Sequence, residues 1–229
     1  MTADIPDWLR QLATAIEEVR PERYSRFRPP DTGGRASAIL ILLGEGPDGP
    51  DLVLIERATT MRSHAGQPAF PGGASDPGDE GAVGTALREA AEEVGLDPAS
   101  VRILAQLPAL WLPPSGFVVT PVLAWWHSPH PVTAVDPAEV DTVVRVPLAE
   151  LAEPDNRMRV RHPSGYIGPA FDVRGMLVWG FTGALVDQVV ALGGWERPWD
   201  PDRIADLPAE AIELAARTLP ADAPRDATA

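Results

Sequence analysis

The segment from Gly73 to Leu96 constrains the fold of this chain more than any other. When residues 80–94 are placed on a helix of 3.6 residues per turn, one stripe of that helix is apolar and must face a core. The members of the stripe are Val83, Ala86, Leu87, Ala90 and Val94. Gly95 follows as a C-cap, and Pro98 prevents the helix from continuing. The sequence therefore predicts a helix that lies against a larger hydrophobic layer.

A second arc of the same helix is acidic. Glu89, Glu92 and Glu93 are neighbours because offsets of three and four residues share a helix face, and Arg88 lies four residues before Glu92. Three carboxylates on about one turn repel one another, and a hard divalent cation would relieve that repulsion. Oxygen ligands suit Mg²⁺ or Mn²⁺, and the chain has no cysteine for a softer metal. We therefore predict the three glutamates as metal ligands, with a solvated acidic surface as the alternative.

The complete pattern reads Gly-x6-Glu-x7-Arg-Glu-Ala-x-Glu-Glu-x-Gly-Leu, from Gly73 to Leu96. It resembles the Nudix box, the signature of the Nudix hydrolases. Two departures occur: six residues rather than five separate Gly73 from Glu80, and Ala90 replaces a larger aliphatic residue. The additional residue precedes the helix, so the spacing from Glu80 to Glu93 is unchanged. The resemblance implies an α/β fold of the Nudix type, an α/β/α sandwich with a mixed sheet and a loop–helix–loop catalytic motif.

The stretch before the helix, Leu54 to Gly73, resembles an additional motif of the coenzyme A pyrophosphatase branch of this family. The residues at the expected spacing are Arg57, Ala58, Arg62, Gly66, Phe70, Pro71, Gly72 and Gly73. Ile55 and Glu56 depart from the opening of that motif. Taken alone, the stretch would be an ordinary glycine- and proline-rich loop with two surface arginines.

The residue types of this loop suit a diphosphate. A chain of net charge −14 must supply fixed cations to hold such a ligand, and guanidinium groups pair bidentately with phosphate oxygens. Arg57 and Arg62 are therefore predicted substrate contacts. Gly72 and Gly73 would let backbone N–H groups approach an anion closely. Further candidates for substrate contact are His64 and Gln67.

Charge and composition exclude several other functions. All 19 basic residues are arginine, so a Schiff-base lysine and a Walker-type phosphate loop are absent. The net charge of −14 opposes binding to nucleic acid or to an anionic membrane. The start of the chain lacks the features of a targeting segment, and no apolar run is long enough to cross a bilayer. We expect a cytoplasmic protein that binds a small molecule, with a homodimer left open.

The chain is expected to have one central domain with two flanks. We expect an N-terminal helix and connector at 1–35, a Nudix hydrolase domain at 36–194, and a C-terminal helical extension with a frayed tail at 195–229. A long loop is predicted at 57–81, where its length favours a functional role. Strands are predicted at 36–43, 51–56, 101–107, 117–126 and 140–146, and further helices at 7–20, 176–192 and 208–218.

The resemblance implies metal-dependent hydrolysis of a nucleoside diphosphate linked to another moiety. The favoured substrate is coenzyme A or acyl-CoA, cut to 3′,5′-ADP and (acyl-)4′-phosphopantetheine. Arg88 would hold the glutamate arc in place, and Mg²⁺ or Mn²⁺ would be the cofactor. The general base would be Glu93 or Glu139, between which the sequence does not choose. Asp136 or Asp141 could replace Glu139 in that role.

Three other functions remain open at this point. The first is a Nudix pyrophosphatase of different specificity, for ADP-ribose, dinucleotides or oxidised nucleotides. The second is a Nudix module that binds a nucleotide without cutting it, although such modules usually lose carboxylates of the box and this chain retains them. The third is a structural acidic protein that binds Ca²⁺ loosely.

Overall fold

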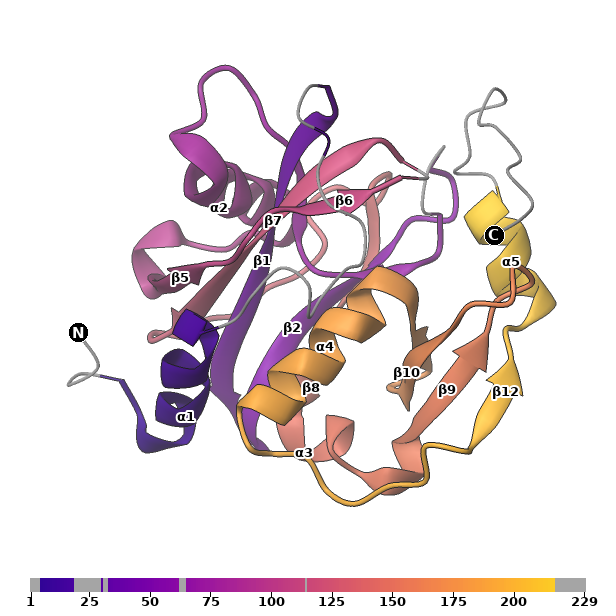
Figure 1. Cartoon of the computed structure of the whole chain (residues 1–229). Helices are drawn as coiled ribbons and strands as arrows, with labels where there is room; N and C mark the ends of the chain where they lie inside the picture. Colours follow the sequence, from indigo (N-terminus) through magenta and orange to yellow (C-terminus); the bar gives the residue numbers. More distant parts are fainter. Residues whose placement is uncertain (1–4, 19–29, 31–32, 62–64, 114, 217–229) are drawn as a thin grey trace.

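A mixed β-sheet forms the centre of the molecule. The computed structural model describes residues 5–18, 30, 33–61, 65–113 and 115–216 (Figure 1). Parallel pairing joins two central strands of the sheet, β1 and β7, and antiparallel pairing joins all its other neighbours. Its strands are β1 (Arg35–Gly46), β2 (Gly49–Arg57), β3 (Pro68–Ala69), β4 (Gly72–Ala74), β5 (Val101–Gln106), β6 (Leu110–Leu112), β7 (Phe117–Trp126) and β8 (Val140–Pro147).

The loop predicted at 57–81 contains two short strands that fill a gap in this sheet. β1 and β2 pair from Leu43 with Leu52 down to Gly46 with Gly49, beside their turn, and then separate. β3 pairs with β2 and β4 pairs with β1, so the segment from 68 to 74 lies between the separated strands. This insertion brings the two consecutive glycines of the loop next to the helix that follows.

Helices cover both faces of the sheet, as the α/β/α prediction requires. Successive side chains of a strand point to opposite faces. Leu40 and Leu42 of β1 pack in a cluster with α2 (Gly81–Val94), whereas Ile41 and Leu43 pack in a cluster with α1 (Asp7–Ala15) and α4 (Gly180–Leu192). Because both faces are covered, β1 is an almost continuous apolar run.

A second, smaller sheet lies beside α4 (Figure 1). Its order is β11-β10-β9-β12, in which β9 and β12 are parallel. The predicted domain boundary at residue 194 therefore falls between two strands that pair with each other. The strands are β9 (Arg157–Arg161), β10 (Ile167–Val173), β11 (Met176–Val178) and β12 (Ile204–Asp206), and the last helix is α5 (Ala209–Ala216).

Most predicted elements of the central domain are confirmed within a few residues of their ends. The helix predicted at 176–192 is wrong over its first turn, because 176–178 is a strand and the helix begins at Gly180. The helix predicted at 7–20 is α-helical to Ala15 and continues as the 3₁₀ helix η1 (Ile16–Glu18). The remaining short elements are η3 (Pro98–Ser100), α3 (Leu148–Leu151) and η4 (Pro154–Asn156).

Among the described residues, every helix falls short of the length and hydrophobicity that crossing a bilayer requires.

Candidate active site

Gly72 and Gly73 lie between β1 and the helix α2, where a Cβ atom at either position would come too close to a neighbouring group. A Cβ atom on Gly72 would come within 2.3 Å of the Ala38 carbonyl oxygen, and Gly72 also adopts a φ of +152°. A Cβ atom on Gly73 would come within 2.6 Å of the Glu89 carboxylate. The two glycines therefore allow the backbone of β4 to approach the acidic arc of α2 directly.

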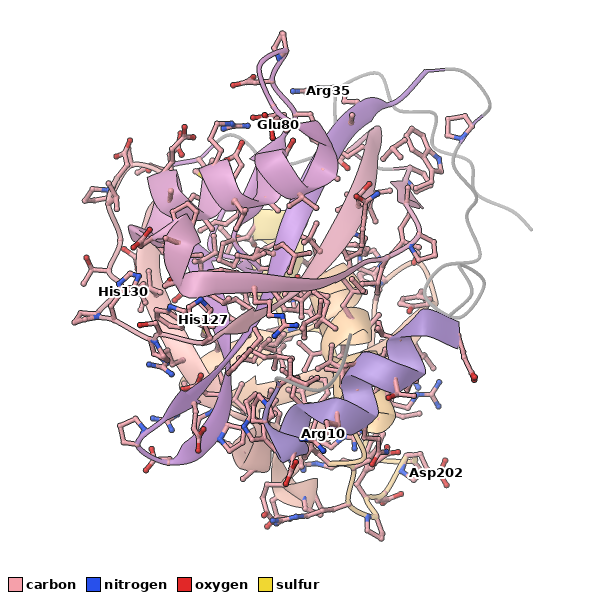
Figure 2. The ribbon with its side chains drawn as sticks, turned by 90° about the vertical axis from the view of Figure 1, so that its left-hand side faces the viewer. Arg10, Arg35, Glu80, His127, His130 and Asp202 are labelled. Atoms are coloured by element: carbon pink, nitrogen blue, oxygen red, sulfur yellow. The ribbon has the colours of Figure 1, made fainter. Side chains whose placement is uncertain are left out.

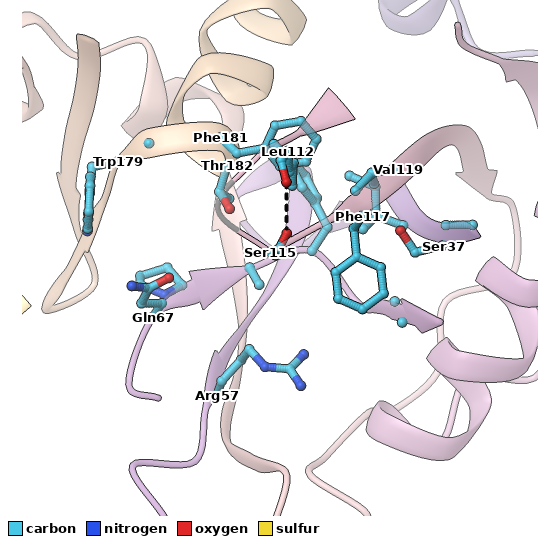
Figure 3. A pocket seen from close by; sticks show the side chains of 18 of the residues that line it. Ser37, Arg57, Gln67, Leu112, Ser115, Phe117, Val119, Trp179, Phe181 and Thr182 are labelled. Carbon is cyan, nitrogen blue, oxygen red and sulfur yellow. Dashed lines mark hydrogen bonds between the residues drawn. The ribbon is translucent and has the colours of Figure 1, made fainter. Parts of the chain in front are cut away.

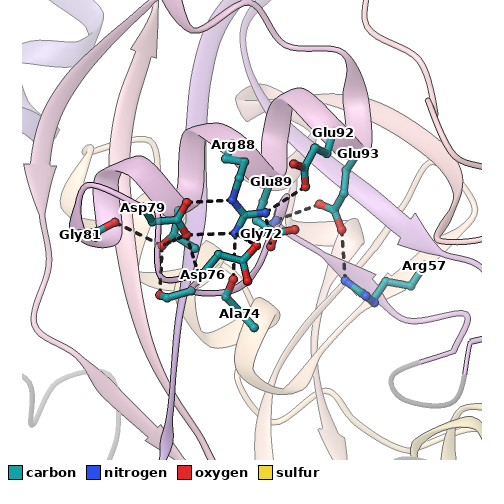
Figure 4. A network of polar contacts seen from close by, with 12 residues as sticks. Arg57, Gly72, Ala74, Asp76, Asp79, Gly81, Arg88, Glu89, Glu92 and Glu93 are labelled. Carbon is teal, nitrogen blue, oxygen red and sulfur yellow. Dashed lines mark hydrogen bonds and ion pairs between the residues drawn. The ribbon is translucent and has the colours of Figure 1, made fainter.

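Glu93 is the most buried of the predicted metal ligands, with its side chain 2% exposed. Its Oε2 accepts a hydrogen bond of 2.9 Å from the Gly72 N–H, and its Oε1 lies 3.4 Å from Nη1 of Arg57 (Figure 4). Burial raises the pKa of Glu93 to about 7, against the opposing effects of Arg57 and the Gly72 N–H. The carboxylate predicted from the box thus faces both the glycines and the first arginine of the preceding motif.

Arg88 connects α2 to the loop before it, and it has more polar partners than the sequence suggests. Its Nη1 lies 2.9 Å from Glu92 and 3.0 Å from Glu89, and its Nη2 donates to the Ala74 carbonyl at 3.0 Å. On the other side, Nε and Nη2 form a bidentate pair with Asp79 at 2.8 and 3.0 Å (Figure 4). Arg88 therefore contacts two of the three predicted metal ligands, and its role in holding them stays a prediction.

Asp79 is a member of this network that the sequence reasoning missed. Its side chain is 7% exposed, and it accepts hydrogen bonds from the Thr85 hydroxyl at 2.8 Å and from the Asp76 N–H at 2.9 Å. The bidentate bond from Arg88 is the main reason that the pKa of Asp79 lies far below its ordinary value. No box position signals Asp79, because it lies in the six-residue stretch between Gly73 and Glu80.

The predicted metal ligands differ in how they are arranged. Glu89 and Glu93 face the glycines, whereas the Glu92 side chain is 59% exposed and paired with Arg88. Within the part of the chain that the structure describes, no three acidic or histidine side chains are already spaced to enclose a cation. The donor set still fits Mg²⁺ or Mn²⁺ in kind, because it consists of carboxylate oxygens that repel one another. Arg88 contacts a single oxygen of Glu92, Oε2, so the other carboxylate oxygen of Glu92 is not used by this pair.

Glu139 lies close to this carboxylate arc. Its charge raises the pKa of both Glu89 and Glu93, although burial is the larger cause for each. The Glu139 carbonyl accepts a hydrogen bond from the Ala58 N–H at 2.8 Å, which ties the start of β8 to the end of β2. We refer to Glu89, Glu92, Glu93 and Glu139 as the carboxylate cluster.

The two alternatives to Glu139 make other contacts. Asp136 accepts a hydrogen bond from the Ala138 N–H at 2.8 Å, and Asp141 raises the pKa of Glu56. Two of the described histidines, His127 and His130, lie at the end of α2 away from Glu80 (Figure 2), where the Asp97 N–H donates to His130.

The predicted substrate contacts of the loop are only partly covered by the structure. Arg57 lies beside Glu93, and its buried Nε has no hydrogen-bond partner among the described residues. The backbone carbonyl of Gln67 accepts a hydrogen bond from the backbone N–H of Arg57 at 3.2 Å. Arg62 and His64 lie outside the described residues.

An apolar cavity of about 660 Å³ opens beside Arg57 and the two glycines (Figure 3). Its walls include Phe70, Phe117, Trp179, Phe181 and Ile212. Thr182 also lines this cavity, from the first turn of α4. Trp111 is not among the described residues that line it.

The comparisons with known proteins agree on one family. The family model described as the NUDIX domain matches residues 34–165. A protein of Photorhabdus laumondii, named "Uncharacterized Nudix hydrolase NudL", is 46% identical over 44% of this chain and 53% of its own length. The protein of that name from Escherichia coli K12 is 41% identical over 51% of this chain and 59% of its own length. The chain thus spans little more than half the length of these curated relatives.

The comparison with solved structures supports the fold. The crystal structure of RenU, a Nudix hydrolase from M. Smegmatis, is 18% identical to this chain and superposes with a TM-score of 0.51. The superposition covers 74% of this chain and 91% of RenU. At this identity the likeness concerns the arrangement of sheet and helices.

Proposed function

This chain belongs to the Nudix family, and from that premise we propose that it is a metal-dependent pyrophosphohydrolase. Its substrate class is a nucleoside diphosphate linked to another moiety. The observation that carries the proposal is the contact between the box helix and the two glycines, where Glu93 accepts from the Gly72 N–H and the Glu89 carboxylate lies against Gly73. A loosely solvated acidic surface would not need glycines at both positions.

The carboxylate cluster would hold Mg²⁺ or Mn²⁺ through Glu89, Glu92 and Glu93. When bound, such a cation neutralises the diphosphate and lowers the pKa of a water molecule. Arg57, which lies beside Glu93, would bind the diphosphate, since guanidinium groups pair with phosphate oxygens. The side chains of Glu93 and Glu139 are the candidates to accept the proton of the attacking water at a carboxylate oxygen. Arg88, already bound to Asp79, would orient Glu89 and Glu92.

Within this class we propose coenzyme A or an acyl-CoA as the substrate. Two features support this choice: the motif from Arg57 to Gly73, and the apolar cavity beside it. The diphosphate of coenzyme A joins a phosphorylated adenosine to a long uncharged arm. An apolar cavity next to a phosphate-binding arginine suits a molecule with this division of charge.

A substrate panel tests the proposed function. The purified chain would be incubated with coenzyme A, octanoyl-CoA, ADP-ribose, NADH, Ap4A and dNTPs, each with Mg²⁺ or Mn²⁺, and the products separated by chromatography. We expect 3′,5′-ADP as the dominant product from coenzyme A and its ester. Turnover of ADP-ribose alone would overturn the coenzyme A assignment while leaving the pyrophosphohydrolase class intact. If every diphosphate in the panel stays uncut, the enzymatic proposal is wrong.

A further inference from the structure

The apolar cavity has a one-sided distribution of charge. Among the described residues that line it, Arg57 is the single acidic, lysine or arginine residue. Figure 3 shows its guanidinium separated from Phe181 and Leu112, with Gln67 between Arg57 and Trp179. The other polar side chains of the cavity carry hydroxyl, amide or imidazole groups, contributed by Ser37, Gln67, Ser115, Thr182 and His162.

This distribution determines which part of a diphosphate substrate can enter. A phosphate monoester placed deep among the apolar walls would lose its hydration without gaining a cation, which is strongly unfavourable. The diphosphate can remain at the mouth, where Arg57 and the glycines meet the carboxylate cluster. The described apolar walls therefore suit an uncharged moiety better than a phosphate. A cavity of about 660 Å³ is within the range that encloses a whole small-molecule group.

The far wall of the cavity comes from the C-terminal part of the chain. Trp179, Phe181 and Ile212 all follow residue 165, where the match to the family ends. The Trp179 ring stacks on His162, with ring centroids 6.3 Å apart and planes inclined by 19°. Trp179 also occupies the N-cap position of α4, so its backbone is fixed by the start of that helix.

We infer that this cavity binds the uncharged arm of the substrate, and that Trp179, Phe181 and Ile212 determine how much apolar arm the enzyme accepts. The inference rests on the proposed function. It adds an orientation: the phosphorylated nucleoside stays outside the cavity, and the arm on the other side of the diphosphate extends from Arg57 toward α4. A longer apolar group on that arm contacts more of the wall and is therefore preferred.

Truncation of the far wall tests this orientation through the ratio of kcat/KM for octanoyl-CoA to kcat/KM for coenzyme A. We expect Trp179→Ala to lower this ratio at least about tenfold, the scale of losing contacts in an apolar specificity pocket. The matched control is Trp111→Ala, because Trp111 lies on the strand that carries Leu112 but packs near Gly34 outside the cavity. The control should keep the ratio of the wild type.

A second pair of variants keeps the inference testable if Trp179→Ala does not fold. Ile212→Ala removes a smaller part of the same wall, and Ile204→Ala removes an exposed isoleucine of β12 that does not line the cavity. We expect Ile212→Ala to lower the ratio and Ile204→Ala to leave it unchanged. Equal ratios in all these variants and the wild type would overturn the inference, even if hydrolysis itself is normal.

Binding of the two product halves gives a readout that needs no turnover. Calorimetry without metal would compare octanoyl-4′-phosphopantetheine with 3′,5′-ADP. We expect Ile212→Ala and Trp179→Ala to lower the affinity for octanoyl-4′-phosphopantetheine and to leave the affinity for 3′,5′-ADP unchanged. If the variants lower only the affinity for 3′,5′-ADP, the nucleoside occupies the cavity and the proposed orientation is wrong. Failure of the wild type to cut any diphosphate would refute the proposed function instead.

Discussion

The carboxylate cluster and the apolar cavity share a border at Arg57, Gly72 and Gly73, yet they are built in opposite ways. Three of the four members of the cluster lie on one helix, α2, and charged hydrogen bonds such as Arg88 to Asp79 join that helix to the loop before it. The cavity comes from segments spread from Ser37 to Ile212, and it is held by packing of apolar side chains.

This difference teaches which changes each region tolerates. The cluster depends on single atoms placed within hydrogen-bond distance, so one altered group changes the chemistry with little loss of fold. The cavity depends on the summed shape of many side chains, so one altered polar group should change little. The predictions below test this contrast, from the largest expected effect to the smallest.

The largest effect is expected from Glu93→Gln. Glutamine preserves the shape of the side chain and an oxygen that can accept from Gly72, but it removes the charge that a cation or an attacking water would use. We expect kcat for the preferred substrate to fall at least about a hundredfold. Steady-state kinetics would be measured alongside circular dichroism and thermal unfolding. Both structural measurements should show an intact fold, because burying the charge of Glu93 is unfavourable and glutamine carries no charge.

Glu139→Gln is the matched comparison for Glu93→Gln. Glu139 is exposed and does not contact the glycines, but it is close enough to influence both Glu89 and Glu93. If Glu139 is the general base, its variant should lose as much kcat as Glu93→Gln and keep its affinity for Mn²⁺. Full activity of Glu93→Gln would remove the role assigned to that residue.

A smaller but still large effect is expected from Gly73→Ala. The new methyl group would come within 2.6 Å of the Glu89 carboxylate, and because that carboxylate ends a flexible side chain, it should move rather than unfold the protein. We expect kcat to fall roughly thirtyfold from this displacement, with a small change in the midpoint of thermal unfolding. Gly78→Ala is the control in the same loop, since its methyl group would meet no atom within 4 Å. Equal activity in the two variants would contradict the inference that the contact between Gly73 and the Glu89 carboxylate matters for catalysis.

An intermediate effect is expected from Asp79→Asn, which removes the carboxylate that binds Arg88 on both nitrogens. Asp79 acts through Arg88, which in turn contacts Glu89 and Glu92. We expect the affinity for Mn²⁺, measured by titration, to fall about tenfold, as for other groups that orient metal ligands. Asp79→Glu should recover part of the loss, whereas unchanged affinity in Asp79→Asn would show that Arg88 needs no such support.

The same variant has a pH signature. The pKa of Asp79 in the folded protein lies below its ordinary value of 3.8 because Arg88 donates to it. A lowered pKa stabilises the folded state above the unfolded value, and this contribution is lost as pH falls through the folded value. The difference in thermal unfolding midpoint between wild type and Asp79→Asn should therefore be constant above about pH 5 and shrink below about pH 4. A difference that grows on acidification would be incompatible with this network.

The sequence predicted the helix well because its signals are local, whereas the role of Gly72 and Gly73 in binding the substrate stays a prediction. Periodicity and spacing within one helix fix which side chains share a face, so the neighbourhood of Glu89 and Glu93 could be stated in advance. The short apolar run of β1 likewise predicted a strand, and its position between two helical layers followed from the family resemblance.

Other parts of the site could not be predicted, because their partners are distant in the chain or carry no pattern. Asp79 is one of several polar residues in a loop, and only the fold shows that it binds Arg88. His162, Trp179 and Ile212 all line the cavity although they are distant in the sequence. Their positions depend on how the second sheet and α4 pack, which the sequence does not indicate. Residues 176–178 were predicted as helix because a short apolar run has no distinct period, and pairing with β10 makes them a strand.

The smallest effect is expected from Ser115→Ala, a polar change inside the cavity. The Ser115 hydroxyl donates to the Leu112 carbonyl at 3.3 Å, a neutral hydrogen bond near the edge of the geometric range. Its loss should lower the free energy of unfolding by at most about 1 kcal/mol. If the cavity acts through shape, kcat/KM for octanoyl-CoA should stay within about twofold of wild type. A loss of activity as large as that of Asp79→Asn would mean that the cavity, like the carboxylate cluster, depends on individual polar atoms, and the contrast between the two regions would fail.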